Sequence, residues 1–318
     1  MLENNNALVV CSNSNEDKMK KCFDNNMLLR FIGFLDVSKK TANTYRKALK
    51  QLMSYFKVHG VVYPQVGDIL NFKRELADKG RKPATIALYL SAIRRFFQWT
   101  AKTGIYSNIA AGIKSPKMAK EHRKDCFSGM QIKSIMSGIK RNSLEGLRNY
   151  AMFALILSCG LRTIEVARAN IGDIRTVAGV SMLFIQGKGR TDKTDFVKLA
   201  PKVEQAINDY LKARGIFNPD EPLFSSNSRR NSGQRLTTTT ISSVCKKAMI
   251  KAGFNSSHLT AHSLRHTAIT TALLSGMSLA DVQQFARHSS INTTMIYNHA
   301  INRMNSQCEN VIANAFFD

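Results

Sequence analysis

A short segment near the middle of the chain constrains the fold most, because it lacks the apolar periodicity found on both sides of it. The segment Ser115–Asp125 reads SPKMAKEHRKD, contains a proline and is densely charged, as is typical of a linker. A chain of 318 residues also exceeds the usual size of one domain. The expected parts are a flexible segment at 1–22, a helical domain at 23–114, a linker at 115–126, a second domain at 127–301 and a C-terminal tail at 302–318.

Helical periodicity dominates the first half. Within Ser38–His59, apolar side chains recur at helical spacing from Ala42 to Phe56, which predicts an amphipathic helix. Ser38 or Thr41 is a suitable N-cap, and Gly60 is a suitable stop signal. Further helices are predicted over Asn26–Leu35, Asp68–Lys79 and Pro83–Lys102.

The second half combines helices with one short β-hairpin. Val180–Gln186 and Thr194–Leu199 alternate apolar and polar residues, and they flank a turn sequence, GKGR, so they predict a hairpin. The fold class is therefore expected to be mainly α, with a helical first domain and a mostly helical α+β second domain that holds a small antiparallel β-sheet. The helices of the second half are expected at Ser128–Lys140, Glu145–Cys159, Arg162–Ala169, Pro201–Arg214, Thr238–Ala252, Ala261–Ser275, Ser278–Arg287 and Thr293–Ile301, followed by an amphipathic stretch at Asn302–Phe316.

The charge of the chain predicts a polyanionic partner. The chain carries 46 Lys and Arg against 22 Asp and Glu, a net charge of +24. Residues 23–114 hold 16 basic and 5 acidic side chains, residues 127–318 hold 23 and 12, and each half therefore carries +11. Nucleic acid is the simplest partner for such a chain, and two equally basic halves suit a clamp around DNA. An anionic membrane surface, or solvated helix faces without a partner, are the alternatives.

No segment predicts secretion or a membrane span. The apolar run Ala7–Val10 is too short for the core of a signal peptide, and the run Ala151–Leu157 is too short to cross a bilayer. The six cysteines are too widely spaced to form a CxxC pair, so free thiols in a reducing cytosol are expected. We therefore expect a cytoplasmic, nucleoid-associated protein without a membrane partner.

Two segments early in the second domain carry residues suited to binding phosphate. Arg162 follows a buried helix that ends at Gly160, and Glu165 lies three residues later on the same helical face. Lys188 stands between two glycines at the tip of the predicted hairpin. Taken alone, each has an ordinary explanation: the first is a surface ion pair and the second is a solvated turn.

Two later segments add histidines, an arginine and a tyrosine. His262 and Arg265 open a predicted helix at spacing i, i+3 and so share a face, near a helix N-terminus where anions bind. His266 is expected to point elsewhere on the helix and to be structural. His288 precedes Tyr297 by nine residues, and a lone tyrosine on a helix is usually a half-buried structural residue.

Taken together, these side chains form a set suited to phosphoryl transfer without a metal ion. Arginine binds phosphate oxygens bidentately and stays charged. The sequence contains no acidic metal cluster among them, no GxxxxGK[ST] loop and no HExxH motif. We therefore expect neither a metal nor another cofactor, and cationic side chains would have to stabilise the charge of the transition state.

The order of these segments resembles that of the tyrosine recombinases, the family of phage integrases and Xer-type enzymes. The family arrangement is Arg, Lys, HxxR, His or Trp, and Tyr. The helical segments SKKTANTYRKAL and KPATIALYLSAIRRFFQW also resemble the helical core-binding domain of that family. The matching segments are GLRTIE at Arg162, GKGRTDKTDFVKL at Lys188, HSLRH at His262 and Arg265, and RHSSINTTMIYNH at His288 and Tyr297.

The sequence departs from the family pattern at one position. The family usually has Leu-Gly before the motif histidine, whereas this chain has Ala286-Arg287. Glycine there allows tight packing, and Arg287 would instead add a contact to phosphate or DNA. Arg190 and Lys193 lie on the same hairpin as Lys188 and are alternatives to it.

The resemblance implies a covalent mechanism. Tyr297 would attack the scissile DNA phosphate, form a 3′-phosphotyrosyl link and release a 5′-hydroxyl. Arg162 and Arg265 would bind the non-bridging oxygens and stabilise the pentacoordinate transition state. His262 would act as general acid or base near the nucleophile, because the phenol, with a usual pKa of about 10, is protonated at neutral pH.

The resemblance also implies roles for three further residues. His288 would add a hydrogen bond to the phosphate, and Lys188 would protonate the leaving 5′-oxygen. Glu165 would orient a catalytic histidine or lysine, with a local ion pair to Arg162 as the alternative. Because the covalent link keeps the energy of the phosphodiester, no high-energy cofactor is implied.

The resemblance further implies a partner and a class of function. The partner would be double-stranded DNA with inverted-repeat core sites, bound by a homotetramer on two sites, with accessory DNA-bending proteins as further partners. The function would be site-specific recombination, such as integration or excision of a mobile element, inversion, or resolution of dimers. A type IB topoisomerase and a non-catalytic DNA-binding regulator are the competing hypotheses. The side chains proposed to contact DNA are Arg94, Arg95, Lys246 and Lys247.

Overall fold

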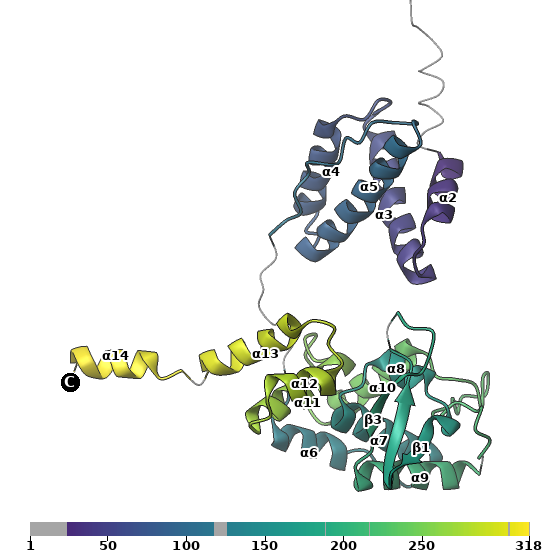
Figure 1. Cartoon of the computed structure of the whole chain (residues 1–318), viewed down its shortest axis with the longest axis vertical. Coiled ribbons are helices and arrows are strands. Elements are labelled where there is room, and N and C mark those ends of the chain that lie inside the picture. Colours follow the sequence, from purple (N-terminus) through teal and green to yellow (C-terminus); the bar gives the residue numbers. More distant parts are fainter. Residues whose placement is uncertain (1–23, 118–125, 188, 216, 305, 318) are drawn as a thin grey trace, which may run out of the picture. The chain divides into compact units, whose positions relative to one another are not determined.

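The computed structural model describes residues 24–117, 126–187, 189–215, 217–304 and 306–317. The described residues form two compact units, one within residues 1–119 and the other within residues 120–318 (Figure 1). In the part of the chain that the structure describes, no helix is long and apolar enough to cross a membrane.

The first unit is a bundle of helices around an aromatic core. Its helices are α2 (Asn25–Phe34), α3 (Lys39–Val58), α4 (Val66–Asp78) and α5 (Pro83–Lys102). Phe31 of α2 is fully buried and meets Phe96 of α5 edge to face, with ring centroids 5.3 Å apart. Burial of such a ring contributes about 2–3 kcal/mol. Ser38 caps α3 through its side chain, as expected from the sequence.

In the second unit, most helices pack around the buried helix α7. Its large hydrophobic cluster includes Phe153 and Leu155 of α7 together with Ile207 and Tyr210 of α9, all less than 2% exposed. The helices are α6 (Gly129–Ser137), α7 (Leu144–Cys159), α8 (Thr163–Arg168), α9 (Pro201–Arg214), α10 (Thr238–Lys251), α11 (Ala261–Leu274), α12 (Leu279–Ala286), α13 (Ile291–Met304) and α14 (Cys308–Phe317).

The small sheet of this unit has three antiparallel strands rather than the two of the predicted hairpin. Strands β2 (Val180–Ile185) and β3 (Asp195–Lys198) pair as expected, with Leu183 opposite Val197. A further strand, β1 (Ile174–Val177), pairs with the other edge of β2. The sequence does not indicate β1, because this strand has only four residues and its burial does not alternate.

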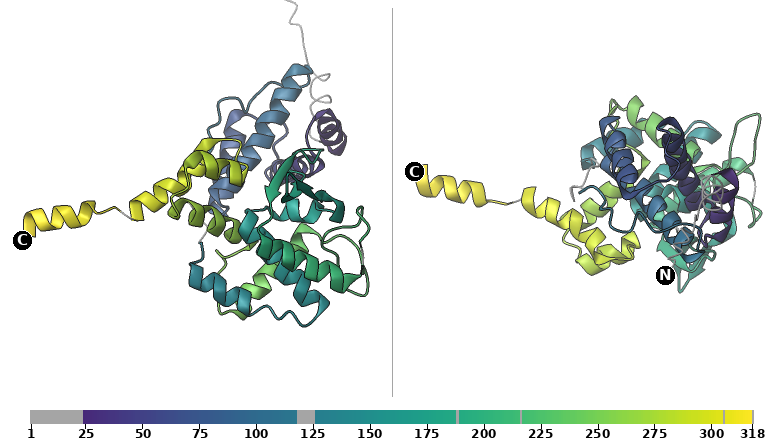
Figure 2. Two further views of the ribbon diagram at one scale, coloured as in Figure 1. Left: turned by 60° about the horizontal axis from the view of Figure 1, so that its bottom comes forward. Right: turned by 90° about the horizontal axis from the view of Figure 1, so that it is seen from above.

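A smaller hydrophobic cluster joins helices α11, α12 and α13. It consists of Ile269 from α11, Val282 and Ala286 from α12, and Tyr297 from α13. In Figure 1 and the left view of Figure 2, the yellow-green helices α11–α13 lie on one side of the unit and the teal strands lie on the other. Helix α11 contributes to both clusters, because Leu264 belongs to the large one and Ile269 to the small one.

Candidate active site

The predicted site residues of the second unit come together where α8, α11, α12 and α13 meet. Arg162 immediately precedes α8, Arg265 lies in α11, His288 follows α12, and Tyr297 lies in α13. These residues line one hollow of about 240 Å³, which is large enough to hold a phosphate group. The full lining is Arg162, His262, Arg265, His266, His288, Thr293, Ile296 and Tyr297.

Gly160 makes the close packing around this hollow possible. It ends α7 in the left-handed conformation, with φ of 57°, which glycine adopts without strain. A Cβ atom at this position would lie 2.9 Å from the ring of Phe285. The turn at Gly160 therefore allows α12 to approach the end of α7 and places Arg162 at the site.

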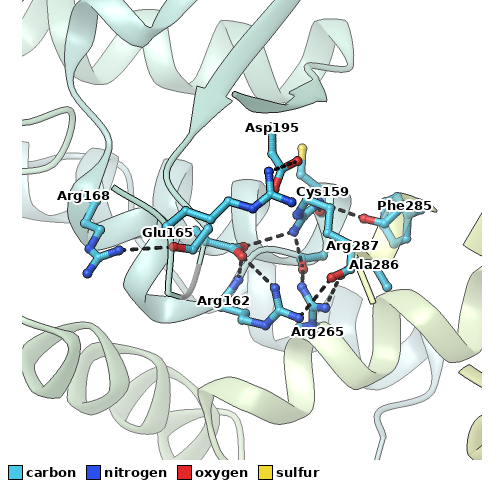
Figure 3. A network of polar contacts seen from close by, with 12 residues as sticks. Cys159, Arg162, Glu165, Arg168, Asp195, Arg265, Phe285, Ala286 and Arg287 are labelled. Atoms are coloured by element: carbon cyan, nitrogen blue, oxygen red, sulfur yellow. Dashed lines mark hydrogen bonds and ion pairs between the residues drawn. The ribbon is translucent and has the colours of Figure 1, made fainter. Parts of the chain in front are cut away.

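Arg265 is a charged residue enclosed by protein. Its side chain is 2% exposed, and its Nη1 donates to the carbonyl of Gly160 at 2.5 Å while its Nη2 donates to the carbonyl of Ala286 (Figure 3). Burial, together with the neighbouring charges of Arg162 and Arg287, lowers the pKa of Arg265 to about 9. The guanidinium remains charged at neutral pH, and a bound anion would relieve the repulsion among the three arginines.

Glu165 forms ion pairs with two of these arginines. Its Oε1 lies 2.8 Å from Nη1 of Arg162, and its Oε2 lies 3.1 Å from Nη2 of Arg287 (Figure 3). Burial favours the protonated acid, but Arg287 and Arg162 outweigh it and lower the pKa of the carboxyl below its usual value. The structure thus shows the local pair with Arg162 that the sequence left open, and both carboxylate oxygens contact guanidiniums.

Arg287 makes most of its contacts within the protein and also lines the cavity that holds Arg162 and Arg190, so its contact with phosphate or DNA stays a prediction. Its guanidinium donates to the carbonyl of Phe285 at 2.7 Å and to that of Gly160 at 3.2 Å, besides its pair with Glu165. Its side chain is 11% exposed. It adopts a left-handed backbone conformation with φ of 53°, which explains why glycine suits this position.

Two substitutions of Arg287 separate the stabilising contacts of its guanidinium from the strain of its left-handed backbone. Arg287→Ala removes the guanidinium and leaves Glu165 with one partner fewer, so we expect the free energy of unfolding to fall by about 1–3 kcal/mol. Arg287→Gly removes the same contacts but also relieves the left-handed strain, and it should be more stable than Arg287→Ala by about 1 kcal/mol. Urea unfolding of the two variants tests this order; an alanine variant as stable as the unmodified protein would contradict it.

His288 is held as a neutral imidazole beside the arginines. Its Nδ1 lies 2.9 Å from the hydroxyl of Thr294. Burial, and then the charges of Arg265 and Arg162, lower the pKa of His288 to about 4. At neutral pH this imidazole can donate a hydrogen bond to a phosphate, but it is a weak proton acceptor.

Tyr297 is buried in the same hollow, and its hydroxyl hydrogen-bonds with Nδ1 of His266. Burial raises the pKa of Tyr297 to about 12, although Arg265 and Arg162 act in the opposite direction. The expectation that His266 points away from the site is wrong. Residues four apart are as close on a helix as residues three apart, and the rings of His262 and His266 lie 4.9 Å apart, edge to face.

The hairpin beside the site contributes Arg190. Lys188, the lysine predicted from the sequence, lies outside the described residues. Of its two proposed alternatives, Lys193 pairs with Asp173 at 2.5 Å. Arg190 pairs with Asp195 at 3.3 Å and lines a cavity of about 780 Å³ together with Arg162.

The four side chains proposed to contact DNA fall into two groups. Arg94 donates to the carbonyl of Ile113 at 2.9 Å, and Lys246 donates to the carbonyls of Ser256 and Leu259. These two therefore anchor backbone segments within their own units. Arg95 and Lys247 are exposed, as a DNA contact requires.

Two family models match the chain. The model described as the phage integrase N-terminal SAM-like domain matches residues 32–104. The model described as the phage integrase family matches residues 126–303, which is more than half of the 318 residues. The matched regions contain the first unit's helices α3–α5 and all of the predicted site residues.

Relatives and solved structures agree with these models. The tyrosine recombinase XerC of Haemophilus influenzae is 33% identical over 227 residues, covering 71% of this chain and 73% of the relative. The tyrosine recombinase XerD of Oceanobacillus iheyensis is 29% identical over 274 residues, covering 83% and 88%. The XerH recombinase bound to its palindromic difH substrate in a post-cleavage complex has a TM-score of 0.71 at 20% identity, covering 93% and 95%. A lambda integrase dimer bound to a COC′ core site has a TM-score of 0.65 at 16% identity, covering 84% and 96%.

Proposed function

This chain belongs to the phage integrase family of tyrosine recombinases, and we propose that it cleaves and rejoins DNA at specific sites with Tyr297 as its nucleophile. The hydroxyl of Tyr297 attacks the scissile phosphate and forms a 3′-phosphotyrosyl bond. The P–O bond to the 5′-oxygen breaks, and the 5′-hydroxyl of a partner strand later reverses the step. The bond energy is retained in the intermediate, so rejoining needs no high-energy cofactor.

Arg162 and Arg265 bind the non-bridging oxygens of this phosphate. They line the same hollow as Tyr297, and their charges are held in a partly dry environment where electrostatic stabilisation is strong. The bonds from Arg265 to the carbonyls of Gly160 and Ala286 and the pair between Arg162 and Glu165 hold the two guanidiniums in place before the substrate arrives. Such preorganisation lowers the cost of reaching the transition state.

The remaining residues of the hollow complete the phosphate site. His288 contributes a hydrogen bond as a neutral imidazole, and His262 lies exposed at the same hollow. Lys188 is proposed to protonate the leaving 5′-oxygen. Arg190, which lines the adjacent cavity with Arg162, is an alternative contact to the phosphate but cannot release a proton at neutral pH.

One observation carries this proposal: a buried tyrosine, two arginines and three histidines line a hollow that has room for a phosphate. We expect the protein to form a covalent complex with nicked duplex DNA. The short strand that carries the released 5′-hydroxyl dissociates there, so it cannot reverse the cleavage and the intermediate is trapped. Digestion and mass spectrometry should place the nucleotide on Tyr297. A nucleotide on another residue, or no covalent complex on any DNA that the protein binds specifically, would contradict the proposal.

We further propose that the two basic units clamp DNA at inverted-repeat core sites. Each half carries a net charge of +11, and most of these cations are expected to neutralise phosphates without reading sequence. Strand exchange between two duplexes requires two bound sites, and we propose a homotetramer for it, assisted by DNA-bending proteins. Integration or excision of a mobile element, inversion and resolution of dimers are all consistent with this chemistry.

The C-terminal helix α14 is proposed to dock on a neighbouring protomer. None of its described residues is buried. Val311, Ile312, Phe316 and Phe317 are each between 55% and 87% exposed. Apolar side chains gathered on one exposed helix mark a contact surface, and α14 follows the helix that carries Tyr297.

Deleting residues 304–318 should abolish cooperative pairing of DNA-bound protomers while sparing binding to a single site. The physical reason is that the deleted segment supplies apolar contact area between protomers but none of the proposed phosphate contacts. The double variant Phe316→Ser, Phe317→Ser should reproduce the loss, whereas Asn314→Ser is a matched control on the same helix. Gel-shift titrations on one-site and two-site DNA measure both properties, and unchanged pairing in the deletion would disprove docking in trans.

A further inference from the structure

We infer that His266 is the proton acceptor for Tyr297, an inference that rests on the proposed role of Tyr297 as the nucleophile. Nδ1 of His266 forms a hydrogen bond with the hydroxyl of Tyr297. The two rings lie 5.2 Å apart between centroids. Tyr297 is 6% exposed and His266 is 7% exposed, so this contact lies within the protein, on the wall of the hollow that would hold the phosphate.

The chemistry requires such an acceptor. The pKa of Tyr297 is raised to about 12 by burial, so its phenol is protonated at the pH of a cell and must lose its proton as the O–P bond forms. The guanidiniums of Arg162 and Arg265 stabilise negative charge but have no lone pair to accept a proton. A neutral imidazole in contact with the hydroxyl is suited to the task.

His288 is a poorer acceptor, although its ring stacks on that of Tyr297 with centroids 6.2 Å apart. Its Nδ1 is engaged with the hydroxyl of Thr294. The charges of three arginines near it disfavour an imidazolium, and its pKa is lowered to about 4. The inference therefore moves the role of general base from His262, where the sequence placed it, to the histidine one helical turn later.

The proposed step balances protons and bonds. As Oη of Tyr297 attacks phosphorus, its proton passes to Nδ1 of His266, which becomes an imidazolium with protons on both ring nitrogens. The P–O bond to the 5′-oxygen breaks, and that oxygen takes a proton from the general acid proposed above, Lys188. During rejoining, the imidazolium of His266 returns its proton to the phenolate as Tyr297 leaves.

Single-turnover cleavage by His266→Asn tests the inference. The substrate is a nicked duplex carrying the site found by sequencing DNA that the unmodified protein traps covalently. Asparagine keeps a polar group near the hydroxyl but accepts no proton, so cleavage should slow by about 10²–10³-fold, while the Kd for the same DNA changes less than about twofold. His258→Asn, the same change on an exposed loop before α11, serves as the matched control.

Two chemical changes, one in the ring of the nucleophile and one at the leaving atom, distinguish proton transfer from a structural role of His266. A fluorinated tyrosine at position 297 has a more acidic phenol and should restore much of the rate of His266→Asn. A 5′-bridging phosphorothiolate has a leaving group that needs no proton, so it should not restore that rate. If sulfur rescues the variant and fluorine does not, or if neither rescues it, His266 is not the acceptor.

A second variant protects the test against a folding defect. His266→Ala opens space at the hydroxyl of Tyr297, and added imidazole should raise its cleavage rate in proportion to the neutral imidazole present. Thermal unfolding of both variants reports stability separately. A cleavage rate equal to that of the unmodified protein, or a loss that imidazole does not relieve in a folded variant, would overturn the inference. Failure of the unmodified protein to form an adduct at Tyr297 would instead overturn the proposed function.

Discussion

Replacing Tyr297 by phenylalanine is expected to abolish covalent trapping of DNA, with a loss of cleavage on the order of 10⁴-fold or more. The phenyl ring retains the packing of the small cluster formed with Ile269 and Val282. The hydroxyl and its hydrogen bond with His266 are lost, at a cost to stability of about 1 kcal/mol. DNA binding should therefore survive, because the ring and the surrounding cations remain.

The matched control for this variant is Tyr210→Phe. Tyr210 is also buried, and its hydroxyl lies 3.2 Å from the hydroxyl of Ser225, within the large cluster and away from the proposed phosphate site. We expect a similar loss of stability with cleavage retained. Cleavage assays on nicked duplex and gel shifts at equal protein concentration compare the two; residual covalent complex in Tyr297→Phe would assign the nucleophile to another residue.

Replacing Arg265 by alanine is expected to reduce cleavage by about 10²–10³-fold, since one cation at the transition state is lost. The carbonyl of Ala286 also loses its bond from Arg265, and that of Gly160 keeps the longer bond from Arg287, which should destabilise the fold by about 2–4 kcal/mol. Arg265→Lys keeps the charge but cannot bridge both carbonyls in the same way. We expect it to recover binding of the phosphate more fully than cleavage.

The salt dependence of DNA binding shows whether Arg265 acts in chemistry or in general attraction. Removing one phosphate contact from many should change the slope of log K against log salt by at most about one. Arg148 offers a matched control, because it is 4% exposed and bonds to the carbonyl of Ser225 at 3.0 Å outside the hollow. If Arg148→Ala lowers cleavage as much as Arg265→Ala at equal fraction folded, the effect of Arg265 is on stability alone.

The sequence predicted helices well where local signals and packing agree. The apolar period of α3 and the cap at Ser38 both appear in the structure. Strand β1 was missed because four residues provide too little periodicity, and because its connection to β2 runs through Ala178, a non-glycine residue with φ of 48°. Strand β1 is stabilised by its pairing with β2, and no local sequence pattern reveals this pairing.

The chemistry of the site could be predicted only in part, because the sequence does not show how the helices pack. Residue types and chain order indicated a phosphate site, but which atoms meet depends on how α11, α12 and α13 pack. His266 was assigned to the wrong face, although its spacing of four from His262 was a usable signal. Arg287 was expected to contact phosphate or DNA, and nothing in its neighbours along the chain indicates its pair with Glu165.

The site residues lie on both sides of the boundary between the two hydrophobic clusters of the second unit. Arg162 adjoins Leu161 of the large cluster, whereas Tyr297 belongs to the small one. The site is therefore complete only while α12 and α13 are closed against the rest of the unit. Local opening costs less free energy than global unfolding, so amide hydrogens of α12 and α13 should exchange before those of α7. Anything that binds the closed arrangement, a phosphate included, would raise the fraction of molecules ready to react.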